Sequence, residues 1–186
     1  MNQSTAWVLV VAILAALLIA WMYLRQRRTV ELHRRFGPEY DRVMRETGTR
    51  KKAEAELENR AKRVEQLAIR PLPPERRERF SERWHEQQSR FVDEPKAAVE
   101  EPDHLVEEVM RERGYPVGEF DQRAADISVT HPRVVQNYRA AHDIATRERS
   151  GQATTDDLRR AMILYRDLFM DLLDDTAQAP QRGVAG

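Results

Sequence analysis

Residues 6–24 read AWVLVVAILAALLIAWMYL and contain no charged side chain. At about 1.5 Å rise per residue, this stretch makes a helix of roughly 28 Å, close to the ~30 Å hydrocarbon core of a bilayer. A single span in lipid must satisfy its own backbone hydrogen bonds, and only a helix does so. We therefore predict a transmembrane helix over residues 6–24, preceded by a short flank at residues 1–5.

The residues around this run are those typical of a membrane interface. They are Trp7 at one end and Trp21, Tyr23, Arg25, Arg27 and Arg28 at the other. The positive-inside rule then predicts an N-terminus outside and a cytoplasmic C-terminal part. A cleaved signal peptide is the alternative, which would make the protein exported. Against it, residues 1–5 carry no Lys or Arg, and the nearest candidate cleavage site, Leu18-Ile19-Ala20, begins with a large residue.

Charge is distributed unevenly along a chain that has 31 Lys and Arg against 31 Asp and Glu. Residues 25–52 contain ten basic and four acidic side chains, whereas residues 93–175 contain eleven basic and nineteen acidic ones. A basic segment beside a bilayer is attracted to anionic headgroups, and an acidic one is repelled. We expect the juxtamembrane arginines to contact lipid headgroups and the acidic part to be held away from the membrane.

Residues 25–70 are predicted to form a basic juxtamembrane segment and a charged stalk. A helix should end at Gly37-Pro38, because this dipeptide stops one helix and starts another. Within 50–70, Leu57, Ala61, Val64 and Ala68 recur at the spacing of a coiled-coil seam. The seam is shorter than three heptads, so a solvated spacer helix and a homo-oligomeric coiled coil both stay open.

The prolines of residues 71–74 exclude helix and predict an extended linker. Apolar residues then recur at helical spacing within 75–92, 102–113, 119–129, 131–150 and from Thr154 onward, with no strand-period run. The sequence therefore predicts an all-α protein whose domain, at 75–175, packs four or five short helices around one core. We expect residues 176–186 to be a disordered tail.

Trp84 and Phe91 share one face of the helix at 75–92. An aromatic stripe at this spacing is typical of a core face, and otherwise of a groove for a protein partner. We therefore name these two residues as possible partner contacts, for the case in which they are not fully buried.

The residues that enzymes and cofactor sites require are missing or scattered. The chain has no cysteine, and its five histidines lack metal-ligand spacing. It has no glycine-rich phosphate loop and no nucleophile motif, and its basic residues lack the interleaved aromatics of a nucleic-acid surface. We predict no cofactor, no metal, no nucleic-acid partner and no catalysis. The alternative is a small-ligand or catalytic site near His131, Tyr138 and His142.

Four stretches, RFGPEYDRV (35–43), RFVDEPKAAVEEPDHLVEEVMRERGYP (90–116), FDQRAADISVTHPRVVQNYRAAH (120–142) and TTDDLRRAMILYRDLF (154–169), together resemble an uncharacterised family of small bacterial proteins. Its members have one N-terminal span and a helical C-terminal domain. The resemblance implies a bacterial inner-membrane setting and brings no activity. The sequence thus favours a membrane-anchored interaction or scaffold protein with a protein partner or a second copy of itself.

Overall fold

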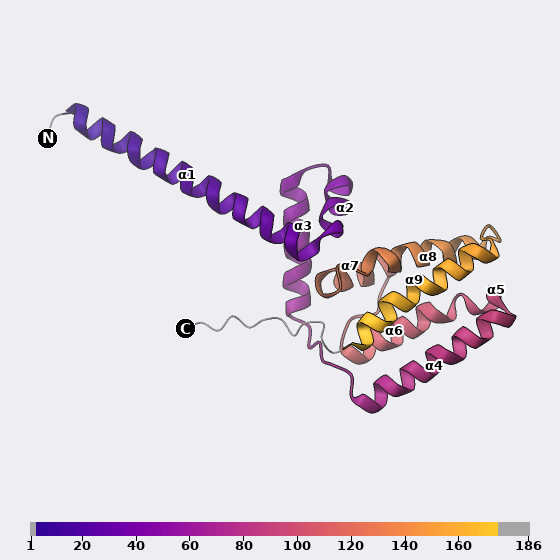
Figure 1. The fold of residues 1–186 in the computed structure, drawn as a ribbon. Helices are drawn as coiled ribbons and strands as arrows, with labels where there is room; N and C mark the ends of the chain where they lie inside the picture. The colour runs from indigo at the N-terminus through magenta and orange to yellow at the C-terminus, as the bar shows by residue number, and fades with distance from the viewer. Residues whose placement is uncertain (1–2, 175–186) are drawn as a thin grey trace.

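The computed structural model describes residues 3–174, except for the side chains of residues 3–6, 8–12, 25 and 97 (Figure 1). Its elements are α1 (Gln3–Phe36), α2 (Pro38–Thr47), α3 (Arg50–Glu65), α4 (Pro74–Asp93), α5 (Pro95–Ala98), α6 (Glu101–Arg113), α7 (Phe120–Thr130), α8 (Val135–Arg149) and α9 (Thr155–Leu173). No strand occurs between residues 3 and 174, so the all-α prediction is confirmed for this range. The tail predicted at 176–186 lies outside the described residues.

The predicted break at Gly37-Pro38 separates α1 from α2. Gly37 adopts φ 50°, which glycine tolerates at little cost, and Pro38 occupies the first turn of α2, where a missing N–H is harmless. The chain reverses here, so α2 folds back beside the end of α1. The sequence also anticipates the start of α9, where Thr154 and Asp157 form a reciprocal capping box.

Helices α1–α3 form a unit with its own apolar cluster, which corrects the predicted stalk. The buried members of this cluster are Leu32, Phe36, Tyr40, Val43, Ala53, Leu57, Ala61, Val64 and Val129. The seam on α3 is therefore covered within the chain by α1, α2 and α7, where we had expected a solvated spacer or a coiled coil. Helix α3 also ends at Glu65, which leaves Ala68 exposed beyond it.

Helices α4–α9 form the predicted bundle around a second core. Its largest fully buried side chains include Tyr138, Tyr165, Phe169, Leu105 and Met110. Helices α8 and α9 run side by side through the bundle, with α6 beneath them and α4 along the outer side (Figure 1). The structure differs from the prediction in three places here: α4 begins at Pro74, inside the predicted linker, α5 is an additional one-turn helix, and α8 begins at Val135, after a turn at 132–134.

The linker between the two helical units is packed against the bundle. Leu72 is buried in the bundle core, and the N–H of Arg70 donates to the carbonyl of Arg113 across 2.9 Å. Gly114, just after α6, has φ 96°, and a Cβ there would lie 2.7 Å from the carbonyl oxygen of Ala68. Glycine is required at this position by both backbone conformation and space.

Candidate functional site

The most unusual surface of the protein is the N-terminal part of α1, which projects away from the rest of the structure (Figure 1). Every described side chain from residue 13 to residue 24 is exposed, and the large aliphatic ones are Ile13, Leu14, Leu17, Leu18, Ile19, Met22 and Leu24. Leu17, Leu18 and Ile19 are consecutive and so point in directions about 100° apart around the helix. The apolar surface therefore encircles α1.

The predicted transmembrane helix at 6–24 falls entirely within α1. The structure provides no helix, within the residues that it describes, of the length and apolar character needed to cross a membrane. Residue 6 and residues 8–12 of the predicted segment have no described side chains.

The predicted interface residues are divided between solvent and α3. Trp7, Trp21 and Tyr23 are exposed, and the guanidinium carbon of Arg27 lies 4.5 Å from the centre of the Tyr23 ring. Arg28 instead forms a bidentate pair with Glu58 of α3, although its side chain stays 59% exposed. The Arg25 side chain lies outside the described ones. One of the three juxtamembrane arginines therefore joins helices in addition to flanking the apolar run.

The base of α1 is fixed to α3 by polar contacts at matching positions. Arg28 pairs with Glu58, and Arg35, seven residues later, lies 3.6 Å from Glu65, also seven residues later. Next to Arg28, the hydroxyl of Thr29 donates to Glu54, one turn before Glu58 on α3, across 2.6 Å. These contacts fix the place where α1 crosses α3 (Figure 1).

Trp84 is a core residue, which corrects its assignment as a possible partner contact. It is 2% exposed, and its ring stacks on Phe169 of α9 with centroids 4.7 Å apart. Phe91 is partly buried against the same core. The aromatic face of α4 is thus covered by α9 and α6, the ordinary result for an amphipathic surface helix.

The alternative site near His131, Tyr138 and His142 is assembled only in part. Tyr138 accepts a hydrogen bond from Arg123 across 3.2 Å, and His142 lies 3.8 Å from Asp103, which also pairs with Arg123. His131 belongs to a different contact, because its Nδ1 lies 2.6 Å from a carboxylate oxygen of Asp171 on α9. It is the residue that follows α7, and its imidazole is buried.

The cluster around Asp103 connects α6, α7 and α8, and all its members except the partly exposed His142 are buried. Burial raises the pKa of the Asp103 carboxyl, but interactions with His142 and the Arg123 guanidinium outweigh burial and hold it below its ordinary value. Burial and the nearby Asp103 charge raise the pKa of Tyr138, so its hydroxyl stays protonated at neutral pH. His142 stacks on Phe120 with centroids 3.6 Å apart. These contacts are those of a structural ion-pair cluster.

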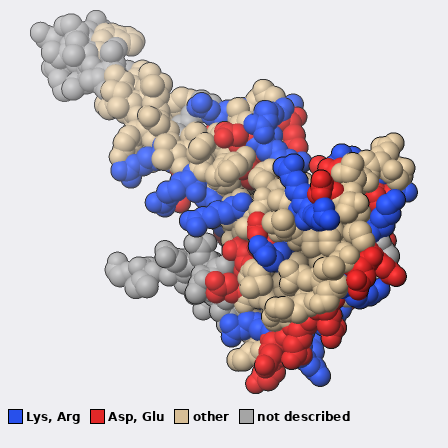
Figure 2. Space-filling model, turned by 45° about the vertical axis from the view of Figure 1, so that its right-hand side comes forward, with Lys and Arg blue, Asp and Glu red and all other residues tan. Residues whose placement is uncertain are grey.

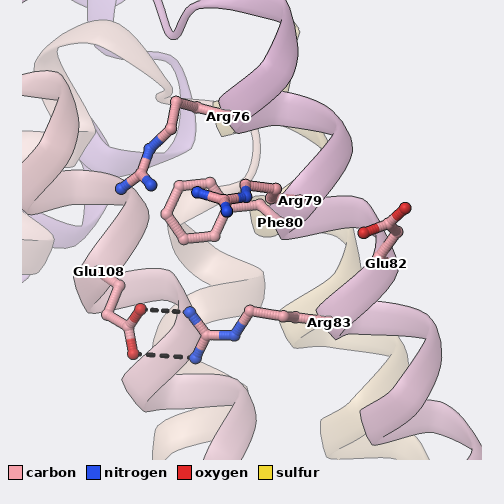
Figure 3. A pocket seen from close by; sticks show the side chains of 6 residues that line it. All are labelled: Arg76, Arg79, Phe80, Glu82, Arg83 and Glu108. Atoms are coloured by element: carbon pink, nitrogen blue, oxygen red, sulfur yellow. Dashed lines mark hydrogen bonds and ion pairs between the residues drawn. The ribbon is translucent and has the colours of Figure 1, made fainter.

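A groove of about 340 Å³ lies between α4 and α6 (Figure 3). Arg76 and Arg83 reach from α4 to Glu112 and Glu108 of α6, and the buried Phe80 ring lies between the two guanidinium groups. Arg79 lies between them, with no hydrogen bond or ion pair to any described residue. Two of the three arginines are therefore already paired with a carboxylate, and these ion pairs along the groove join α4 to α6.

The buried carboxylate of Glu39 was not predicted from the sequence. It is fully buried, and it receives hydrogen bonds from Arg60 of α3 at 3.0 Å and from Arg139 and Gln136 of α8 at 2.9 Å and 2.7 Å. Arg42 on its own helix lies 3.3 Å away. A glutamate after Pro38 is an ordinary first-turn residue of a helix, so no local signal marks it as a junction between α2, α3 and α8.

The surface charge separates along the molecule on the face that Figure 2 shows. Lys and Arg gather beneath the projecting apolar stretch of α1, and Asp and Glu gather at the lower end, where α4 lies. No family model matches the chain, and searches of curated proteins and of solved structures find no match either.

Proposed function

We propose that this protein is a membrane-anchored interaction protein, in which the N-terminal stretch of α1 lies in the bilayer and the bundle is presented to a protein partner. The observation that carries the proposal is the apolar surface that encircles α1 over residues 13–24. Fully burying one such side chain is worth about 1.5–3 kcal/mol, and soluble monomers rarely expose apolar patches larger than a few hundred Å².

The all-round distribution favours lipid over a protein groove as the surface that covers α1. A helix that docks in a groove buries one stripe and keeps a polar face, whereas residues 13–24 have no charged side chain on any face. Trp21 and Tyr23 at the C-terminal end of the stretch are the residue types enriched at headgroup level. The apolar residues 8–12 extend the same run toward the N-terminus.

The orientation we propose is an N-terminus outside and a bundle in the cytoplasm of a bacterial cell, at the inner membrane. The arginines and lysines of residues 25–52 support it, because basic residues next to a span are retained in the cytoplasm. The acidic bundle then faces away from the anionic membrane surface. We propose a binding or scaffolding role without catalysis, through a protein partner or a second copy of the chain.

Topology is tested by fusing the C-terminus separately to a reporter active only in the cytoplasm and to one active only outside it. We expect cytoplasmic activity from full-length protein in the membrane fraction. Activity of the external reporter, or a shortened product released from the membrane, would refute the proposed orientation and favour an exported protein.

A further inference from the structure

We infer that the protein has a second membrane contact at the turn between α2 and α3, where Arg45, Arg50, Lys51 and Lys52 form a surface that binds anionic lipid headgroups. We call these four residues the basic turn. All four side chains are exposed, and none forms a hydrogen bond or ion pair with any residue that the structure describes. The inference deepens, and rests on, the proposed anchoring by α1.

The acidic residues that flank the basic turn in sequence form no ion pair with it, so the turn keeps a net positive charge. Glu46 pairs with Arg42 at 2.7 Å, and Glu56 pairs with Arg60 at 2.8 Å. Glu54 accepts hydrogen bonds from the hydroxyls of Thr29 and Tyr40, and these neutral donors leave its negative charge in place. The four cations of the basic turn therefore form no ion pair with any described residue, whereas Arg28 and Arg35 at the base of α1 are paired with Glu58 and Glu65 of α3.

The fold gives no reason of its own for these cations. Arg50, Lys51 and Lys52 occupy the first turn of α3, which has no acidic residue, and cations at a helix N-terminus oppose the helix dipole. Their position therefore costs folding free energy instead of contributing to it. A surface that binds anions is the physical setting in which this arrangement becomes favourable.

The basic turn lies on the side of the protein from which the apolar stretch emerges. Helix α1 crosses α3 obliquely and contacts it through the Arg28–Glu58 and Arg35–Glu65 pairs, and the turn before α3 precedes these contacts along α3 (Figure 1). Figure 1 shows the turn between α2 and α3 at the upper end of α3, away from the linker to α4. A bilayer that holds residues 6–24 is thus the anionic surface best placed to meet it.

The test uses the absence of cysteine from the full-length chain. A single fluorophore is attached at Thr49→Cys, whose side chain is exposed and makes no capping hydrogen bond, and the protein is reconstituted into lipid nanodiscs. Quenching by headgroup-labelled lipid is measured with neutral phosphatidylcholine and with about one third phosphatidylglycerol. A label at Val92→Cys, at the end of α4 in the bundle, is the distant reference.

We expect quenching at Thr49→Cys in anionic discs, little in neutral discs, and loss of quenching in 1 M salt, where charge is screened within about 3 Å. Replacing Arg45, Arg50, Lys51 and Lys52 by Gln should reduce the ratio of lipid-contacting to free protein by at least about tenfold. The matched control replaces Lys96, Arg111, Arg160 and Arg166, exposed bundle cations, by Gln and should leave quenching unchanged.

The outcomes separate this inference from the anchor itself. If the protein resists alkaline extraction but shows no charge-dependent quenching at Thr49→Cys, lipid binding by the basic turn is refuted and anchoring by α1 still stands. Protein that is extracted, yet is quenched on anionic vesicles only when the basic turn is intact, would support the turn and refute the anchor. If both quadruple variants lowered quenching equally, lipid contact would depend on the net charge of the protein and not on the basic turn, and the inference would be overturned.

Discussion

The carboxylate of Glu39, on α2, lies 2.9 Å from a guanidinium nitrogen of Arg139, on α8, and joins residues a hundred positions apart in the chain. The same carboxylate accepts from Arg60 of α3 and Gln136 of α8. A second pair, Arg63 with the buried Asp126 of α7, lies at 2.7 Å. The unit of α1–α3 is therefore held to the bundle by buried charges as well as by apolar contacts around Val129.

Replacing Glu39 by Ala is expected to destabilise the protein by about 3–5 kcal/mol, because it leaves the buried guanidinium group of Arg139 without an anion and leaves Arg60 with Glu56 alone. Urea unfolding followed by circular dichroism measures the change. Glu46→Ala is the control, since it removes an exposed i,i+4 pair with Arg42 and should cost less than about 0.5 kcal/mol. Similar losses from the two variants would mean that Glu39 is not a junction.

Gly114→Ala is expected to destabilise more than Gly48→Ala, although both glycines have positive φ. At Gly48 the new Cβ meets nothing within 4 Å, so only the backbone cost of about 1–2 kcal/mol applies. At Gly114 the Cβ would lie 2.7 Å from the Ala68 carbonyl and must displace the linker. Thermal unfolding of both variants measures the difference, and equal costs would show that the linker yields freely.

Trp84→Ala is expected to cost about 3–5 kcal/mol, the usual range for removing a buried aromatic side chain. The ring is stacked on Phe169 inside the bundle, so its loss leaves a cavity. Val92→Ala, at an 80% exposed position on the same helix, should change the unfolding free energy by less than about 0.5 kcal/mol. A Trp84 variant of unchanged stability would restore this residue as a candidate for partner binding.

The pH dependence of stability should include a contribution from Asp103. Its pKa in the folded protein is lowered, so the unfolded chain binds more protons as the pH falls through the acidic range. The stabilisation by Asp103 is therefore complete at neutral pH and is lost below about pH 4. Asp103→Asn should cost about 2–3 kcal/mol at pH 7 and progressively less toward pH 2.5.

Urea unfolding at several pH values tests this dependence, with the exposed Asp143→Asn as the control variant. The control should leave the pH profile unchanged. A penalty for Asp103→Asn that stays constant from pH 7 to pH 2.5 would show that the carboxyl titrates normally in the folded state.

Local patterns predicted most of the helices because each boundary depends on neighbouring residues. Gly37-Pro38 ends one helix and starts the next, and the Thr154–Asp157 capping box begins α9. The apolar stripe of α9, with Leu158, Tyr165 and Phe169, was likewise a reliable sign of a core face. At these positions, interactions between residues close in sequence determine where a helix begins, where it ends and which face it buries.

The contacts between distant segments were not predictable in this way. The seam of α3 has the same spacing whether it meets a second chain or Phe36 and Tyr40 of its own chain, so spacing could not identify its partner. The partners of charged residues could not be predicted either. Arg28, beside an apolar run, was interpreted as a topology signal, yet it also pairs with Glu58, thirty residues later. The role of Glu39 depends on Arg139 and Gln136, which no local pattern links to it.

Alkaline extraction of membranes from cells that express the chain tests most directly whether the N-terminal stretch of α1 lies in a bilayer. We predict that the wild-type protein stays in the membrane pellet at about pH 11. Leu14→Arg with Leu17→Arg should release it, since each arginine near the centre of a span costs about 2.5–3.5 kcal/mol. Val30→Arg, which places a charge on α1 beyond the apolar stretch, should remain in the pellet. Wild-type protein in the soluble fraction, with its helical circular dichroism spectrum intact, would contradict the proposed anchor.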